Sequence, residues 1–169
     1  MSKSIVIFGS ARSNGYTKKA VDVALLGYEY KFVDLSNLVI KPFDYKKNNH
    51  NDDFIPLMKN ILEYEQIFLA TPIYWYAPST RMKIFLDRWS DVAKEPYKKI
   101  GKALCDKRVF VISSNGVSPS KCFEEIFEQT CEYLSMQYMG CYNYHSGDNR
   151  EQLLHSRKEL IKFRKKITG

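Results

Sequence analysis

The chain has 169 residues, of which 44% are hydrophobic and 27% are charged, so it can form one domain with a full core and is too apolar to be disordered. Its longest apolar runs have the length of a strand, which excludes a membrane-spanning helix of about 20 residues. The N-terminal sequence MSKSIVIFGS lacks the long apolar segment of a secretory signal, so we expect a cytoplasmic protein.

The net charge of +7 permits three interpretations. A basic chain can bind nucleic acid, but much of the excess lies in the C-terminal sequence RKELIKFRKK, whose helical spacing favours a solvent-exposed helix face. The third interpretation is attraction of an anionic small molecule. We expect neither a nucleic-acid partner nor a membrane partner.

Apolar runs of strand length alternate along the chain with segments whose apolar residues recur at helical spacing. In chain order they predict strand 3–8, helix 20–25, strand 30–35, helix 54–62, strand 66–71, helix 82–89, strand 108–113, helix 123–134, strand 136–141 and helix 151–166. Segment 36–52 is a long polar connection with no clear element. Strands that are apolar throughout predict a parallel sheet covered by helices on both faces, in a single domain spanning 1–169.

The first informative loop follows the first predicted strand and reads GSARSNGYT, residues 9–17. Small residues, hydroxyl groups, Arg12 and a helix start directly behind them are typical of a phosphate cradle. The spacing matches neither the nucleoside-triphosphate loop nor the dinucleotide glycine pattern, and the loop contains no cysteine nucleophile. The alternative is a turn in which Ser13 or Asn14 caps the helix and no ligand binds.

The second loop places Tyr74, Trp75 and Tyr76 between Pro72 and Pro78. Flat apolar rings beside backbone polar groups suit a planar heterocycle, which can stack on the rings and form hydrogen bonds at its edge. The alternative is that Tyr74 or Trp75 packs under the next helix or at a subunit interface. If the loop is extended, Tyr74 and Tyr76 share one side and Trp75 takes the other.

The third loop begins with Ser114, Asn115 and Gly116, which offer polar groups and a tight turn. In an open parallel sheet, ligands bind beyond the carboxyl ends of the strands, where all three loops meet. A phosphate at the first loop, a planar ring at the second and ring-edge contacts at the third describe a mononucleotide with a large heterocycle. FMN fits this description better than AMP.

The first loop, together with the sequence TPIYWYAPSTRMKIFLDR, resembles the flavodoxin-like family of NADPH-dependent FMN reductases and NAD(P)H:quinone reductases. The resemblance implies a flavodoxin-like fold, with a five-stranded parallel sheet of order 2-1-3-4-5, and a homodimer or homotetramer. It also implies a role for each matching position. The residues are Ser10, Arg12, Ser13, Gly15, Tyr16 and Thr17 at the FMN phosphate, Pro72, Ile73, Tyr74 and Trp75 against the isoalloxazine ring, and Ser114, Asn115 and Gly116 near its pyrimidine edge.

These inferences predict an FMN-dependent oxidoreductase that transfers a hydride from NAD(P)H through FMN to a quinone or similar small acceptor, including free flavin. No side chain is required as a catalytic acid, base or nucleophile, and no metal is expected. Iron–sulfur relatives carry cysteines before the second helix, whereas this chain has none there. His145 either lines the entrance of the site or, as we favour, is a solvated loop residue.

Two other functions compete with this prediction. A flavodoxin-type electron carrier would use the same fold without a substrate of its own, but a basic chain is better suited to attract the anionic NAD(P)H. A basic, non-enzymatic interaction domain would leave the three loops unexplained.

Overall fold

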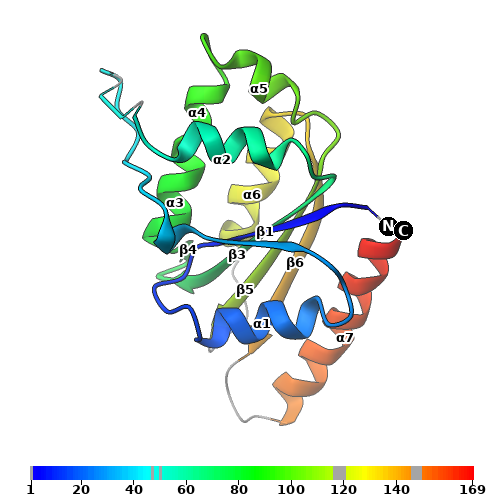
Figure 1. The fold of residues 1–169 in the computed structure, drawn as a ribbon. Helices are drawn as coiled ribbons and strands as arrows, with labels where there is room; N and C mark the ends of the chain where they lie inside the picture. The colour runs from blue at the N-terminus through cyan, green and yellow to red at the C-terminus, as the bar shows by residue number, and fades with distance from the viewer. Residues whose placement is uncertain (1, 47, 50, 116–120, 146–149) are drawn as a thin grey trace.

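Five parallel strands form the centre of the computed structural model, which describes residues 2–46, 48–49, 51–115, 121–145 and 150–169. The strands are β1 (Ser4–Phe8), β2 (Lys31–Asp34), β3 (Gln66–Tyr74), β5 (Arg108–Asn115) and β6 (Gln137–His145), in the order β2-β1-β3-β5-β6 (Figure 1). The predicted fold and strand order are confirmed. A short strand, β4 (Ala77–Pro78), was not predicted and pairs antiparallel with β3.

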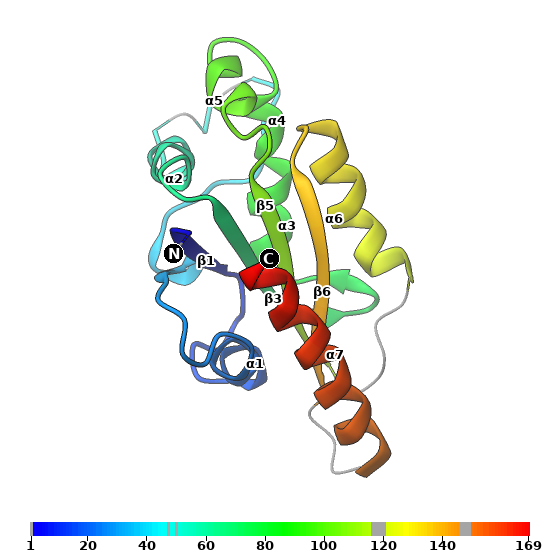
Figure 2. The ribbon, with the colours of Figure 1, turned by 90° about the vertical axis from the view of Figure 1, so that its right-hand side faces the viewer.

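Helices cover both faces of the sheet (Figures 1 and 2). On one face lie α1 (Tyr16–Ala24) and α7 (Arg150–Thr168), and on the other lie α2 (Phe54–Ile61), α3 (Thr80–Asp87) and α6 (Lys121–Tyr133). Short helices η1 (Leu35–Asn37), α4 (Trp89–Val92) and α5 (Lys98–Lys102) complete the set described. The predicted helix around 82–89 is divided into α3 and α4, and α5 was not predicted.

The strands are apolar throughout because both faces of the sheet are buried. In β1, Ile5 and Ile7 pack with the side of α2, α3 and α6, whereas Val6 and Phe8 pack with α1 and α7. All five residues of β1 are buried, as are the first seven residues of β3. This arrangement gives two hydrophobic cores, one on each face.

Parallel pairing brings the loops that follow β1, β3 and β5 to the same edge of the sheet. The first loop also lies against the start of α3, because a Cβ atom at Gly9 would lie 2.9 Å from Cβ of Met82. Only glycine permits this approach without a shift of Met82. The carboxyl edge is therefore a close assembly of the first and second loops.

The long connection before α2 is fastened to α3 and α4 by a buried arginine. Arg88, fully buried, binds both carboxylate oxygens of Asp52 and donates through Nε to Asp91 Oδ2 at 2.6 Å. It also donates to the backbone oxygen of Lys41 at 2.9 Å and to that of Asn49 at 3.5 Å. We call these five residues the Arg88 cluster.

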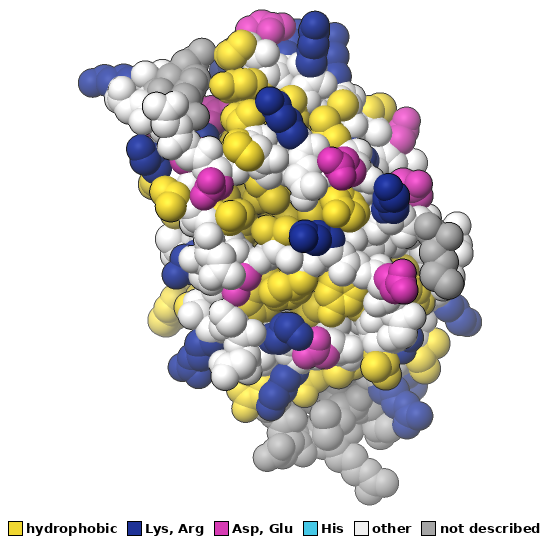
Figure 3. All heavy atoms as spheres, in the orientation of Figure 1, with side chains coloured by type: hydrophobic (Ala, Val, Ile, Leu, Met, Phe, Trp, Pro, Cys, Tyr) yellow, Lys and Arg dark blue, Asp and Glu magenta, His cyan; other side chains and the backbone are white. Residues whose placement is uncertain are grey.

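On the face drawn in Figure 3, acidic and basic side chains are interspersed over a largely hydrophobic and neutral surface. In the described part of the chain, no helix combines the length and the hydrophobicity needed to cross a bilayer.

Candidate functional site

The first loop ends at an uncapped helix. The N-cap of α1 is Gly15, which has no side chain, and the first turn of the helix contains no acidic residue. The predicted alternative, in which Ser13 or Asn14 caps this helix, is therefore wrong. Backbone N–H groups at Tyr16 and Thr17 belong to this first turn, which suits an anion.

The hydroxyl groups of the first loop differ in what they contact. Ser10 is buried, and its Oγ accepts a hydrogen bond from the backbone N–H of Arg12 at 3.3 Å. Ser13 Oγ instead donates to Asp34 Oδ2 at 2.9 Å, at the end of β2. Sequence reasoning placed no acid in this loop, but the fold brings Asp34 to it. The Ser13 side chain is therefore directed toward β2, whereas the Arg12 side chain is exposed.

A hydrogen bond joins the first and third loops. Thr17 Oγ1 and Ser114 Oγ lie 2.8 Å apart, and both residues are buried. Two hydroxyl groups that share one bond retain a second hydrogen, which can be donated elsewhere. The structure therefore brings together two residues that the sequence assigned to different parts of one ligand site.

The second loop is a tight hairpin rather than an extended segment. Tyr74 of β3 pairs with Ala77 of β4, and the two residues between them, Trp75 and Tyr76, have φ angles of 49° and 65°. Positive φ at both turn positions is the pattern of a type I′ turn, which normally uses glycine or asparagine. The expected alternation of side chains is therefore wrong, because it assumed an extended loop.

The aromatic side chains of this hairpin are exposed to solvent. The exposed fractions are 53% for Tyr74, 94% for Trp75 and 65% for Tyr76. The alternative in which Tyr74 or Trp75 packs under the next helix is therefore wrong. Bulky residues at positive φ gain no burial here, so the fold does not explain their presence.

The base of the hairpin is held firmly, in contrast to its tip. Pro72 is buried and lies opposite Ser114 of β5, and Ile73, which is half-buried, lies opposite Pro78 of β4. Ser79, the N-cap of α3, donates to the backbone oxygen of Gly9 and its N–H donates to Thr71 Oγ1 at 3.0 Å. These bonds join the second loop to the first.

The third loop contains a polar cluster that the sequence reasoning missed in part. Ser113 Oγ donates to Asn143 Oδ1 at 2.8 Å, Asn143 Nδ2 donates to Asn115 Oδ1 at 2.9 Å, and His145 Nε2 lies 3.3 Å from Asn143 Nδ2. We call these four residues the Asn143 cluster. The predicted residue Gly116 lies outside the described residues.

His145 is 5% exposed and belongs to β6, so the expectation of a solvated loop histidine is wrong. The predicted strand 136–141 ended too early, because Asn143 and His145 are polar. Parallel pairing of the fourth and fifth predicted strands could have indicated these residues, because Ser113 of β5 lies opposite Asn143 of β6.

The thiol of Cys141 lies beside the same cluster, 3.4 Å from Ser113 Oγ. Burial raises the pKa of the Cys141 thiol to about 12, so this thiol stays protonated at neutral pH.

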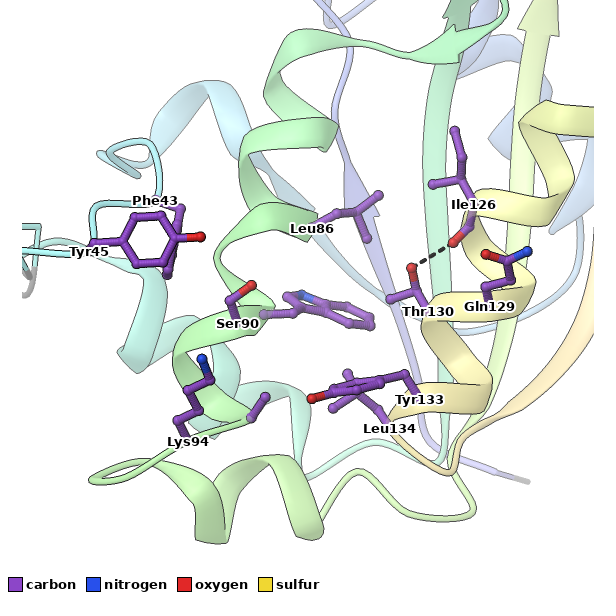
Figure 4. A pocket seen from close by; sticks show the side chains of 12 residues that line it. Phe43, Tyr45, Leu86, Ser90, Lys94, Ile126, Gln129, Thr130, Tyr133 and Leu134 are labelled. Atoms are coloured by element: carbon purple, nitrogen blue, oxygen red, sulfur yellow. Dashed lines mark hydrogen bonds between the residues drawn. The ribbon is translucent and has the colours of Figure 1, made fainter.

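A hollow that none of the three loops lines lies between α3 and α4 on one side and α6 on the other (Figure 4). Its volume is about 430 Å³, and Phe43, Tyr45, Thr130 and Tyr133 contribute to its lining. It shares no residue with the predicted site. Among the residues described, no group of three histidine, cysteine or acidic side chains is placed to hold a metal ion.

Comparison with known proteins gives a family match. The sequence model of the family described as NADPH-dependent FMN reductase matches residues 2–149. The chain is 28% identical over 152 residues to YwqN of Bacillus subtilis strain 168, which carries the name of an NAD(P)H-dependent FMN-containing oxidoreductase; the alignment covers 82% of each chain.

Solved structures agree with the fold. The Trp repressor binding protein of Bacillus subtilis superposes with a TM-score of 0.72 at 24% identity, covering 96% of this chain and 99% of that one. An FMN-dependent NADH-azoreductase from Bacillus anthracis, solved with FMN, gives a TM-score of 0.70 at 10% identity and full coverage of both chains. At these identities the likeness establishes the fold.

Proposed function

The chain belongs to the family of NADPH-dependent FMN reductases, and on that premise we propose that it uses NAD(P)H to reduce a small acceptor through an FMN bound across the three loops. The family makes it an FMN-dependent oxidoreductase with NAD(P)H as the electron donor. The identity of the acceptor, a quinone or free flavin, and the positions of the binding residues are the parts that we propose.

The uncapped start of α1 is the observation that carries this proposal. The Gly15 cap and the acid-free first turn leave backbone N–H groups and the positive end of the helix for an anion. Arg12, Ser10 and Thr17 add a guanidinium and two hydroxyl groups beside it. This set of donors fits the phosphate of FMN, whereas the Ser13 hydroxyl, directed to Asp34, contributes less than the resemblance implies.

The other two loops fit the ring. The exposed aromatic faces at Tyr74, Trp75 and Tyr76 offer stacking surfaces, and Ser114 and Asn115 offer hydrogen bonds to a polar edge. When bound, FMN supplies the hydride-accepting ring and passes the reducing equivalents to the acceptor. The protein holds the phosphate, orients the ring and leaves one side of it accessible to NAD(P)H and then to the acceptor.

The competing function is a flavodoxin-type electron carrier. The family match is to reductases, and the net charge of +7 favours the approach of an anionic nicotinamide nucleotide. Two further expectations from the sequence stay predictions: a cytoplasmic location, and a homodimer or homotetramer, which sedimentation of the purified protein measures.

Anaerobic mixing of the FMN-loaded protein with NADH or NADPH tests the proposal. We expect the visible absorption of oxidised flavin to disappear promptly, and to return when a quinone or free FMN is added. Retention of FMN without bleaching by either nucleotide would support the electron carrier instead. Release of FAD on denaturation, or no flavin retained after reconstitution, would contradict the site itself.

A further inference from the structure

A buried serine bonds the second loop to the first. Ser79 is 4% exposed and is the N-cap of α3, and its hydroxyl donates a hydrogen bond to the backbone oxygen of Gly9, where the first loop begins. Ser79 Oγ also accepts from the backbone N–H of Met82 at 3.3 Å. A hydroxyl group has one hydrogen, and Ser79 uses it on Gly9, so this hydrogen is not available to a ligand.

The backbone of Ser79 is bonded to the base of the aromatic hairpin. Its N–H donates to Thr71 Oγ1 at 3.0 Å, and the hydroxyl of Thr71, which is fully buried, donates to the backbone oxygen of Pro72 at 3.1 Å. Thr71 and Pro72 belong to β3, from which the hairpin projects. Ser79 therefore joins three parts of the fold: the end of β3, the start of α3 and the first loop.

Close packing holds the start of the first loop at the same place. The N–H of Gly9 donates to the backbone oxygen of Ala70 at 2.8 Å, and a Cβ atom at Gly9 would lie 2.9 Å from Cβ and 3.1 Å from N of Met82. The other end of the loop is held by the hydrogen bond between Thr17 and Ser114. Short contacts therefore set the distance between the first loop and the hairpin.

We propose that Ser79 is a positioning residue that fixes the distance between the phosphate site in the first loop and the ring site at the hairpin, and so makes the protein prefer FMN to riboflavin. This inference rests on the proposed function, which assigns the two ends of FMN to these two loops. Ser79 acts through Gly9, because its hydroxyl hydrogen is used within the protein.

The physical reason is that FMN has two ends joined in one molecule. Once the ring is bound, the phosphate binds without a further loss of translational freedom, provided that the two sites are held at the matching distance. If that distance fluctuates, the phosphate contributes less to the affinity even though every donor of the first loop is still present. Riboflavin has no phosphate, so its affinity does not depend on the distance between the loops.

The ratio of the dissociation constants of riboflavin and FMN tests the proposal. In Ser79→Ala, we expect the dissociation constant of FMN to rise roughly fivefold and that of riboflavin to change by less than about twofold, as measured by fluorescence titration. Ser79→Thr keeps the hydroxyl and should bind FMN to within about twofold of wild type. Loss of the helix cap alone would weaken both ligands alike and leave the ratio unchanged.

A second variant changes the distance and keeps the Ser79 hydroxyl. Gly9→Ala must push the first loop away from the start of α3, so it should lower the same ratio. It also carries the test if Ser79→Ala does not fold. Ser4→Ala is the matched control, because Ser4 is a buried serine at the opposite end of β1 whose Oγ donates to Gln66 Oε1 of β3 at 3.1 Å. We expect this control to change neither dissociation constant.

Each outcome decides the role of Ser79. An unchanged ratio in Ser79→Ala, or a loss of FMN affinity as large in Ser4→Ala, would overturn the positioning role while the proposed function stands. If Ser79→Ala weakens FMN alone and Gly9→Ala has no effect, the hydroxyl acts on the phosphate directly, and the positioning role is again overturned. A wild-type protein that binds no FMN would overturn the proposed function and this inference with it.

Discussion

Two buried polar clusters in this protein differ in where their hydrogen bonds end. In the Arg88 cluster, the hydrogen bonds of the guanidinium described by the structure go to carboxylates or backbone oxygens within the fold, and the guanidinium lies over the ring of Phe54. In the Asn143 cluster, the chain of donors runs outward to Asn115 at the carboxyl edge of the sheet. The first arrangement holds two segments of the chain together, and the second joins the ends of β5 and β6 at the edge of the sheet where the three loops lie.

The two clusters show that buried polar groups occur both near the three loops and away from them. Arg88 is the more deeply buried residue and has the stronger partners, yet it lies away from the three loops. Asn143 is neutral and slightly exposed, but it forms a hydrogen bond to one of the predicted site residues, Asn115 of β5. Substitutions in the Arg88 cluster and at the proposed site residues of the three loops should therefore separate stability from FMN binding.

The largest expected effect follows from removing Arg88. Arg88→Met leaves the carboxylates of Asp52 and Asp91 without their buried partner, which should lower the free energy of unfolding by about 3–5 kcal/mol. Urea denaturation measures this loss. FMN affinity of the protein that remains folded should stay close to that of wild type. A variant that is as stable as wild type, or one that stays folded but loses FMN, would break the comparison.

The pH dependence of stability gives a second test of the Arg88 cluster, through the carboxylate of Asp52. Burial alone would raise the pKa of Asp52, but hydrogen bonds from Arg88 and from the backbone of Lys41 and Phe54 outweigh it and hold the pKa below its ordinary value. A lowered pKa stabilises the fold above the ordinary carboxylate pKa of about 4, and this stabilisation is lost as the pH falls through the lowered value. The difference in stability between wild type and Asp52→Asn should therefore be largest at neutral pH and shrink in acid.

A substitution in the first loop should weaken FMN binding and leave the stability of the fold unchanged. Arg12→Ala removes an exposed guanidinium from the first loop, and a charge-assisted hydrogen bond contributes roughly 1.5–3 kcal/mol, or about a ten- to hundredfold change in FMN affinity. Riboflavin, which lacks the phosphate, should bind the variant and wild type equally. Fluorescence titration with both ligands measures this, and the urea midpoint should not move.

A charge control accompanies Arg12→Ala. Lys102→Ala removes an exposed positive charge from α5 and should leave FMN affinity unchanged. If Arg12→Ala weakens riboflavin as much as FMN, the guanidinium does not act on the phosphate. Arg12 would then be assigned to the nicotinamide nucleotide rather than to FMN.

The features that could be predicted from the sequence are those that leave a local pattern of apolar and polar residues. Apolar strands and amphipathic helices predicted a parallel sheet covered on both faces, because burial on both faces leaves a signal in every strand, and the family resemblance supplied the strand order. The meeting of Arg88 with Asp52 joins residues 36 positions apart, so no local pattern could reveal it. Asn143 and His145 were missed because polar residues inside β6 resemble the end of a strand.

The backbone conformation of the hairpin between β3 and β4 was not predicted, for a different reason. Its turn has positive φ at Trp75 and Tyr76, where the sequence rule expects glycine or asparagine. Tyr74, Trp75 and Tyr76 were nevertheless placed correctly at the carboxyl edge, because the topology of a parallel sheet fixes where its loops lie. The prediction of position succeeded, and the prediction of conformation failed.

The smallest expected effect is at that tip, where a bulky residue occupies a conformation that glycine prefers. Trp75 has a φ of 49° and is 94% exposed, so its ring adds no burial to offset the backbone strain. Trp75→Gly should therefore leave the free energy of unfolding unchanged or raise it by about 1 kcal/mol. The same change removes an aromatic face from the proposed flavin site, and stacking contributes on the order of 1 kcal/mol. FMN should bind more weakly and fluoresce more strongly when bound, since a neighbouring tryptophan quenches flavin emission.

Two companion variants decide whether the ring or the turn is responsible. Trp75→Leu keeps the strained backbone and removes the aromatic face, so it should reproduce the changes in affinity and emission without the gain in stability. Tyr133→Leu removes an exposed tyrosine near the C-terminal end of α6, which runs antiparallel to the strands and ends away from the three loops, and it should change neither. If both Trp75 variants bind FMN and fluoresce as wild type does, then the aromatic tip serves neither the fold nor the flavin. Its exposed faces would then be assigned to the acceptor or to a second subunit, which acceptor kinetics and sedimentation of the same variants distinguish.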